Sequence, residues 1–181
     1  MKLHAAILLT VATLAYGLQS TTTVFDMPGQ SGDSRTFTTF VADLRAENFD
    51  GVIKSADNTG MWMYYDEINY SSDYGMNVVW GLNNDAEFDN THAFSSIRYA
   101  GSSEDLYTSS FMVYEGDWFG GAEYYGETSI PSLSGLKVSS LVVIGDYAWT
   151  FYDYENWEGH CFCVYPDTSN EFPMEWSSSW R

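Results

Sequence analysis

One aromatic motif recurs four times in this chain and constrains the fold more than any other feature. The copies at 114–121 and 152–159 both read Tyr-x4-aromatic-x-Gly. The copy at 65–72 keeps both aromatic residues and has Ser at the Gly position, whereas the copy at 25–32 keeps the Gly and has Gln at the second aromatic position. We number these motifs one to four in chain order. Internal repeats with a period of a few tens of residues indicate that each repeat is one supersecondary unit.

A serine follows each motif at a matched distance and opens a short apolar stretch. Four serines lie 26 to 31 residues after the first aromatic residue of a motif: Ser55, Ser96, Ser140 and Ser179. The distance is longer in motifs one and two than in motifs three and four. This pairing predicts two domains, each built from two motifs.

These residues resemble the βγ-crystallin family. Its Greek-key motif carries Tyr/Phe-x4-Phe/Trp-x-Gly in a folded hairpin between the first two strands, and a serine at the start of the fourth strand. The resemblance covers nearly the whole mature chain and implies an all-β fold of two tandem Greek-key β-sandwich domains. The framework positions that it implies are Phe25, Gly32, Ser55, Tyr65, Tyr70, Ser96, Tyr114, Phe119, Gly121, Ser140, Tyr152, Trp157, Gly159 and Ser179.

The physical chemistry of these residue types agrees with a folded hairpin. Glycine adopts positive φ without strain, which suits Gly32, Gly121 and Gly159. The two aromatic rings would close over the bend and bury apolar area, and a serine hydroxyl can bond the backbone of the bend. Ser72 predicts a second hairpin that is more strained or differently shaped, and Gln30 weakens the aromatic contact in the first.

The N-terminus has the pattern of a targeting segment. Lys2 precedes an apolar run at 5–15, and small residues follow at Ala15 and Gly17. This pattern is typical of a signal peptide, and the run is shorter than the roughly 20 residues that a membrane span needs. We therefore expect a signal peptide at 1–17 and a secreted, extracellular mature protein.

Strand signals run through the rest of the chain. Segments such as 111–114, 141–144 and 149–154 are short, aromatic and β-branched, and are bounded by Gly, Ser or Asp. The segment 40–47 has the pattern of a helical turn or two. The expected organisation is a domain at 18–101, a polar linker at 102–109 and a domain at 110–181.

The chain is strongly acidic, with a net charge of −18 and a pI near 4.1. Nucleic-acid binding requires clustered Lys and Arg, so this class of partner is excluded. Acidity of this size favours solubility and association with cations or a basic protein. After removal of the signal peptide no membrane span is expected, and the chain is expected to be a monomer or a weak oligomer.

Neither the histidines nor the cysteines of the mature chain indicate a catalytic site. His92 lies in a polar run that predicts an exposed loop, and His160 directly precedes Cys161. Neighbours on a strand face opposite ways, so this His and Cys would not form a nucleophilic pair. Cys161 and Cys163 would share one face of a strand as partly buried small residues. No catalytic set is present, and an enzyme is not expected.

Calcium is the one cofactor that the resemblance raises. Some βγ-crystallins bind it through Asn/Asp-Asn/Asp-x-x-Ser/Thr-Ser, and calcium needs several oxygen ligands. In motif one, Lys54 replaces the hydroxyl ligand. No copy of the ligand sequence is intact, so no cofactor is expected. The weak candidate ligands are Asp89, Asn90, Ser95 and Glu175.

The leading expectation is a secreted, non-enzymatic protein with a structural, protective or binding role. The alternatives are an extracellular calcium-binding protein and a defence, toxin-like or inhibitor module, which the resembled fold also hosts. Fold alone does not choose among these roles. The sequon at Asn69 offers N-glycosylation, whose use depends on whether this side chain points outward.

Overall fold

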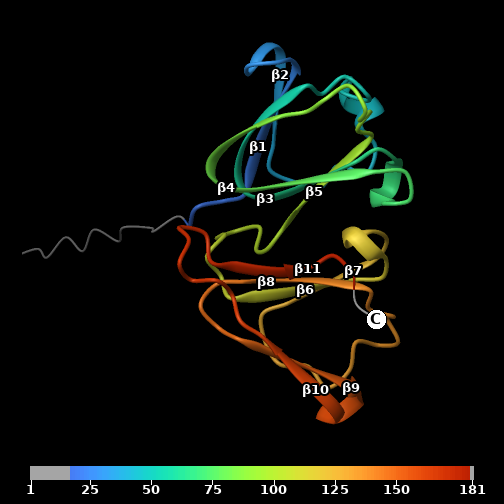
Figure 1. Cartoon of the computed structure of the whole chain (residues 1–181), viewed down its shortest axis with the longest axis vertical. Helices are drawn as coiled ribbons and strands as arrows, with labels where there is room; N and C mark the ends of the chain where they lie inside the picture. The colour runs from blue at the N-terminus through green and yellow to red at the C-terminus, as the bar shows by residue number, and fades with distance from the viewer. Residues whose placement is uncertain (1–16, 180–181) are drawn as a thin grey trace, which may run out of the picture.

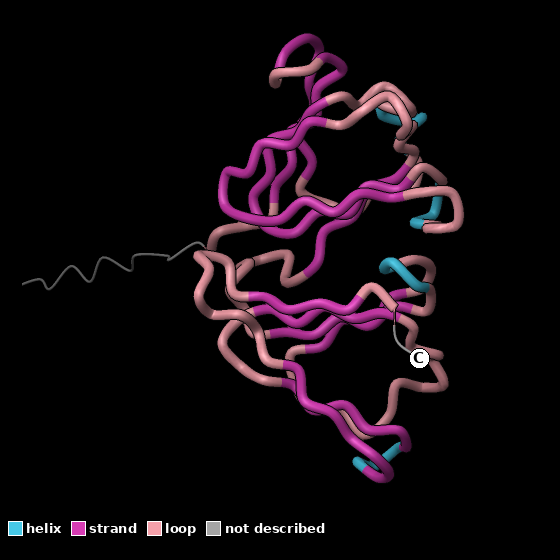
Figure 2. Tube along the Cα trace, in the orientation of Figure 1, coloured by secondary structure: helices cyan, strands magenta, loops and turns pink. Residues whose placement is uncertain are grey.

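The computed structural model describes residues 17–179, whose regular structure consists of β-strands and short 3-10 turns. The elements form two halves, 17–101 and 102–179, stacked along the long axis of the molecule (Figures 1 and 2). The all-β expectation is confirmed. Within the described range no helix is long and apolar enough to cross a membrane. The predicted signal segment lies, except for Gly17, outside the described residues.

The elements follow the motifs along the chain. In the first half they are β1 (Thr21–Met27), β2 (Ser31–Phe37), η1 (Leu44–Glu47), β3 (Ser55–Tyr65), η2 (Ile68–Tyr70), β4 (Met76–Glu87) and β5 (Ser96–Ala100). In the second half they are β6 (Ser110–Tyr114), η3 (Asp117–Phe119), β7 (Glu123–Gly126), β8 (Ser140–Ile144), β9 (Trp149–Tyr154), η4 (Glu155–Trp157), β10 (Glu158–Val164) and β11 (Met174–Ser177).

Strand β3 runs through the end of motif one into motif two and joins them. Its first part pairs antiparallel with β1, and its second part, beyond Gly60, pairs with β5. β4 follows β3 along both parts, with a register shift between Asn58 and Gly60. Gly60 has a φ of 90°, and a Cβ there would lie 2.5 Å from the Ser20 hydroxyl oxygen. Glycine is therefore required where the sheet bends.

The second half repeats this arrangement with one difference. β6 pairs with β7 and β8, as β1 pairs with β2 and β3. Gly145, with a φ of 91°, follows β8 at the place where Gly60 bends β3. Here, however, β9 leaves the sheet, and β10 is its one partner among the described strands. β9 and β10 form a separate sheet at the end of the molecule opposite β1 and β2 (Figure 1).

Alternating residues of β3 serve two different apolar clusters, as the two-residue period of a strand requires. Trp62 and Tyr64 face the core of the first half, which contains thirteen buried residues. Met61, Met63 and Tyr65 face the other way, into a cluster shared with the second half. The two halves are thus joined by an apolar layer rather than by the linker alone.

The core of the second half is less complete. Its cluster has four buried residues, Phe111, Val113, Leu141 and Val143. The side chains packed around them remain partly exposed, and they include aromatic residues of the β9–β10 sheet. The difference between thirteen and four buried residues shows that part of this core lacks a cover within the described chain.

All four hairpins share a backbone signature at their second anchor. Gln30, Tyr70, Phe119 and Trp157 all have φ between 50° and 63°. This left-handed region is uncommon for residues other than glycine. The glycines two positions later in motifs one, three and four also have positive φ, from 74° to 84°. Ser72 does not, so the second hairpin closes in a different way.

A serine hydroxyl holds three of these hairpins closed. Ser55 accepts a hydrogen bond from the backbone N–H of Gln30 at 3.0 Å and donates one to the Met27 carbonyl at 2.7 Å. Ser96 and Ser140 make the same two bonds in motifs two and three, at 2.6 to 3.0 Å. All three side chains are fully buried, so each hydroxyl satisfies backbone groups that water does not reach.

The expectation that Ser179 is a framework serine like Ser55, Ser96 and Ser140 is wrong. Ser179 is exposed, lies just after β11, and does not bond the fourth hairpin as the other three serines bond theirs. β11 pairs with β8, as the last part of β4 pairs with the first part of β3. β11 is therefore the third strand of motif four. No fourth strand of this motif occurs within residues 17–179.

Replacing Ser140 with Ala tests the hairpin anchor, and Ser179→Ala is the matched control. Ser140→Ala leaves the Phe119 N–H and the Gly116 carbonyl without their partner in a buried site. The free energy of unfolding should fall by about 1–3 kcal/mol. Ser179→Ala, on an exposed residue, should change it by less than about 0.5 kcal/mol. Urea denaturation of both variants measures this, and equal effects would contradict the assignment.

Candidate functional site

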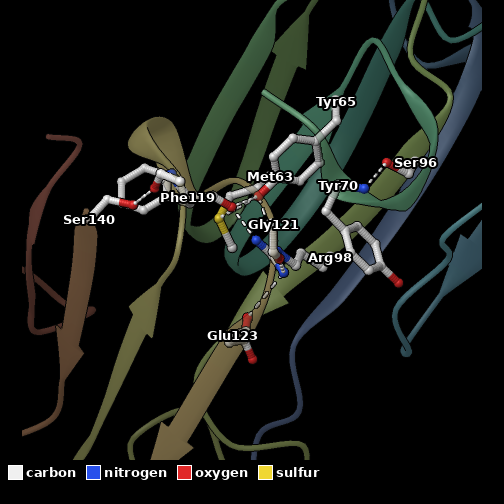
Figure 3. Close-up of polar contacts among 10 residues, drawn as sticks. Met63, Tyr65, Tyr70, Ser96, Arg98, Phe119, Gly121, Glu123 and Ser140 are labelled. Atoms are coloured by element: carbon white, nitrogen blue, oxygen red, sulfur yellow. Dashed lines mark hydrogen bonds and ion pairs between the residues drawn. The ribbon is translucent and has the colours of Figure 1, made fainter. Parts of the chain in front are cut away.

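The most elaborate polar cluster lies between the two halves, around Arg98 (Figure 3). This side chain, only 2% exposed, extends from β5 into the shared apolar layer. Its Nε donates to the Tyr65 hydroxyl at 3.1 Å and its Nη1 to the Gly121 carbonyl at 3.1 Å. Its Nη2 donates to the Phe119 carbonyl. One cation of the first half is thereby bonded to the third hairpin.

Aromatic rings enclose the same guanidinium. Its central carbon lies 4.7 Å from the ring centroids of both Tyr70 and Tyr114, and 5.4 Å from that of Tyr65. A cation over aromatic faces is stabilised by the ring quadrupole, more so when it is desolvated. The rings come from both halves, so they also contribute to the junction.

Glu123 is the carboxylate that faces this cation. Its Oε2 lies 3.8 Å from Arg98 Nη1, which is ion-pair range but too long for a hydrogen bond. Burial raises the pKa of Glu123, and the attraction of Arg98 offsets this only in part. Burial likewise raises the pKa of the Tyr65 hydroxyl. The donors of Arg98 are directed at protein groups of both halves, so the cluster stabilises the junction.

The second and third hairpins contact each other directly beside this cluster. Ser72 Oγ donates to the Asp117 carbonyl at 2.7 Å, and the Gly121 N–H donates to the Tyr70 carbonyl at 3.1 Å. A Cβ on Gly120 would lie 2.4 Å from Ser72 Oγ. The serine that replaces glycine in motif two thus takes part in the junction between halves.

The structure does not bring the predicted calcium ligands together. Asp89, Asn90 and Ser95 lie in the loop between β4 and β5, whereas Glu175 lies on β11 in the other half. Asp89 Oδ1 accepts bonds from the N–H and hydroxyl of Thr91, which lower the pKa of Asp89. Within residues 17–179 no group of three His, Cys, Asp or Glu residues is placed to hold a metal ion.

The histidines each face a carboxylate. His92 is only partly exposed, contrary to the expected open loop, and its Nδ1 lies 3.1 Å from Asp66 Oδ2. His160 is fully exposed beside Asp153, also at 3.1 Å. In the described part of the chain neither imidazole is hydrogen-bonded to a Ser or Cys side chain. These pairs therefore lack the nucleophile of a hydrolytic site.

Cys161 and Cys163 are both free and exposed, so the expectation of partial burial is wrong. Their face of β10 carries no covering layer, because β9 and β10 stand apart from the larger sheet. Asn69 is exposed at its hairpin, the outward orientation that a glycan requires.

The second half contains a large open cleft of about 1010 Å³. The loop at 127–138 forms one wall and strand β9 the other, and Phe111 and Leu141 lie at its floor. Its apolar side chains belong to the incompletely covered core. Its lining also includes the carboxylates of Glu127, Asp153 and Glu155, and no Lys or Arg.

The aromatic anchors of motif four lie at this cleft and are exposed. Tyr152 is 40% and Trp157 is 52% exposed, whereas Tyr114 and Phe119, their counterparts in motif three, are fully buried. The motif-three pair is covered by the junction between the halves, and motif four has no such cover. All four residues were expected from the sequence to be framework residues, but in the structure only the motif-three pair is buried.

Comparisons with known proteins bear on the fold. A scan of protein-family models and a search of curated proteins find no match to this sequence. Among solved structures, the chain is similar to Geodin, a beta-gamma crystallin from Geodia cydonium. The match has a TM-score of 0.66 and 19% identity, and covers 87% of this chain and 99% of Geodin. The fold is that of the βγ-crystallins. The resemblance found in the motif residues is confirmed at the level of fold.

Arg98, Glu123 and the cleft were not predicted from the sequence. A signal for Arg98 was present, because it is a charge inside the otherwise apolar stretch 97–100. A charge in a strand that is buried on both faces needs a buried partner. The cleft had no such signal, since its walls are a loop and a strand that are brought together only by the fold.

Glu123→Gln tests the electrostatics of the junction. Because the folded-state pKa of Glu123 is raised, its contribution to stability is present below the unfolded pKa. That contribution is lost as the pH rises through the folded pKa. The free energy of unfolding of the wild type, relative to Glu123→Gln, should therefore fall as the pH rises from about 4 toward neutrality. Chemical denaturation over this range measures the difference.

The exposed Glu104 provides the control for that experiment, because Glu104→Gln removes one negative charge from the surface. The part of the pH dependence that Glu123→Gln changes and Glu104→Gln does not is specific to Glu123. A difference between wild type and Glu123→Gln that does not change with pH would show that burial does not perturb this carboxyl.

Calcium should have little effect on stability. A ligand that binds only the folded state raises stability once its concentration exceeds its dissociation constant. The candidate ligands Asp89, Asn90, Ser95 and Glu175 are not assembled. The melting temperature in millimolar calcium should therefore exceed that in chelator by no more than the melting temperature in equal magnesium does. A calcium-specific rise in melting temperature that Ser95→Arg abolishes would contradict this.

Proposed function

We propose that this chain is a secreted, non-enzymatic binding protein of βγ-crystallin fold, and that its ligand occupies the cleft of the second half. The observation that carries the proposal is the cleft itself, with a volume of about 1010 Å³ and an apolar floor. Binding sites are typically concave and mostly apolar, with a few polar groups that fix orientation. The carboxylates at 127, 153 and 155 are such groups.

Several observations favour binding over the other expected roles. A purely structural protein has no need of an open cleft in its core, whereas a binding protein does. The histidine pairs lack a nucleophile, which agrees with a non-enzymatic role. The calcium alternative gains no support, because its candidate ligands lie in two separate regions. The described residues also give no specific support to the inhibitor alternative, because no loop among them is marked as reactive.

Secretion and organisation are part of the proposal. The apolar run at 5–15 after Lys2 supports an exported protein. We assign two tandem domains, 18–101 and 110–181, joined by 102–109. The net charge of −18 supports a monomer or weak oligomer whose partner is cationic.

A neutral apolar dye such as Nile red tests binding at the cleft. Its fluorescence should rise saturably with the wild type. Ile130 lines the cleft and is only partly buried, so Ile130→Arg should weaken dye binding about tenfold by placing a charge among apolar groups.

The matched control is Val52→Arg, which changes an exposed apolar residue of the first half in the same way. This variant should bind the dye as the wild type does. Absence of saturable binding, or equal binding by both Arg variants, would contradict the proposed function.

A further inference from the structure

Both cysteines of the chain lie on one strand, two residues apart. Cys161 and Cys163 belong to β10, and both thiols are free and exposed. The pairing of β10 with β9 shifts register before Cys161 and is regular from Cys161 to Val164. This part of β10 is therefore ordinary extended strand, in which side chains two residues apart point to the same side.

The neighbours of the two cysteines show which side this is. Phe162 lies between them on β10, pairs with Phe151 of β9, and packs with it against the core of the second half. Both thiols therefore point away from that core, toward solvent. Neither cysteine lines the cleft, so a site at these thiols goes beyond the proposed function.

The strand keeps the two thiols from forming a disulfide with each other. At a rise of about 3.3 Å per residue, the β-carbons of Cys161 and Cys163 lie about 6.6 Å apart. A disulfide requires about 3.8 Å between these atoms. The pairing of Cys161 with Tyr152 and of Cys163 with Thr150 holds the strand at its extended spacing. Both thiols are therefore free to act as ligands in the folded chain.

A metal ion spans a distance that a disulfide does not. Metal–thiolate bonds are about 2.3 Å long, so a linear two-coordinate ion joins sulfurs about 4.6 Å apart. Each sulfur then leans about 1 Å toward the other from the strand spacing. Thiolates are soft ligands and select soft ions such as Cu(I). Zinc takes four ligands, and no third His, Cys, Asp or Glu of residues 17–179 is placed to join the two thiols.

His160 is next to Cys161 in sequence but is bound elsewhere. Its Nδ1 lies 3.1 Å from Asp153 Oδ2. Asp153 comes two residues after Phe151 on β9, so it shares the side of Phe151. The imidazole is thereby directed to the side of β10 that the thiols do not face. The site consequently has two protein ligands, which suits an ion that prefers two.

The surroundings of the thiols favour a bound cation. Thr150 Oγ1 lies 3.2 Å from Cys163 Sγ, and a hydroxyl that donates to a thiolate favours this charged form. The segment 149–164 contains Asp153, Glu155 and Glu158 and has no Lys or Arg. No protein cation of this hairpin offsets the charge of two thiolates, whereas a metal ion bound between them does.

We infer that Cys161 and Cys163 together bind one soft monovalent metal cation, of the class of Cu(I) and Ag(I), as a two-coordinate dithiolate. Two S–H bonds break, two sulfur–metal bonds form, and two protons pass to solvent, because thiolates are the ligands. The oxidation states of sulfur and metal do not change. The site is a soft-metal site on the outer face of the β9–β10 sheet.

Titration with Ag(I), which is redox-inert under these conditions, tests the inference. The mature chain is kept reduced and free of oxygen, chloride is omitted, and binding is followed by calorimetry. One ion should bind per chain. At pH 6, where free thiols are protonated, about two protons should be released per ion, as measured in buffers of different ionisation enthalpy.

Cys161→Ser and Cys163→Ser should each weaken Ag(I) binding by about 10²- to 10⁴-fold, because the second ligand is then no longer held on the same strand. His160→Gln should leave affinity and stoichiometry unchanged. All three substitutions are at exposed positions, and melting temperatures confirm that the variants fold.

The matched control keeps two exposed thiols and moves one of them to the other side of the strand. The double variant His160→Cys with Cys161→Ser has this property, since His160 faces away from Cys163. It should bind Ag(I) as weakly as Cys161→Ser alone. Tight binding by this variant would show that thiol number rather than strand geometry makes the site, and would overturn the inference.

Three further results would overturn it. These are equal affinity of the wild type and either single Cys variant, loss of binding on His160→Gln, and one ion bound per two chains, which would assign the thiols to a link between copies. A disulfide between Cys161 and Cys163 in the folded chain, detected by mass spectrometry before reduction, would contradict the strand geometry on which the site depends.

Discussion

The burial of Arg98 between the two halves is the interaction on which the arrangement of this molecule depends. A guanidinium removed from water is tolerated only with full compensation, here from backbone carbonyls of the third hairpin, the Tyr65 hydroxyl and three tyrosine rings. Neither half supplies this set alone. The halves must therefore pack with the second and third hairpins face to face.

This packing makes the four hairpins unequal. Those of motifs two and three meet at the junction, and those of motifs one and four lie at the far ends (Figure 1). At one end the sheet of β1 to β5 closes over thirteen buried residues. At the other end β9 and β10 stand apart, and a cleft remains over the core. The described residues thus form one half with a closed core and one half with an open cleft.

Local sequence predicted much of the framework because its chemistry is local. A hairpin with left-handed residues requires its glycine and its serine at fixed distances, so the spacing of Ser55, Ser96 and Ser140 reveals three Greek keys. The same spacing failed at Ser179, which is exposed and does not hold a hairpin. Spacing does not distinguish a third strand from a fourth, since that difference lies in pairing.

The sequence by itself determined the all-β fold, the repeated hairpins and the acidic character, because these follow from residue type and short-range spacing. Only the tertiary structure decided that Arg98 is the cation at the junction, that Tyr114 is buried while Tyr152 is exposed, and that a cleft lies beside β9. These properties depend on which surfaces meet across the two halves. A repeated motif is the same in sequence wherever it stands, and only its neighbours in space determine whether its aromatic anchors are buried or exposed.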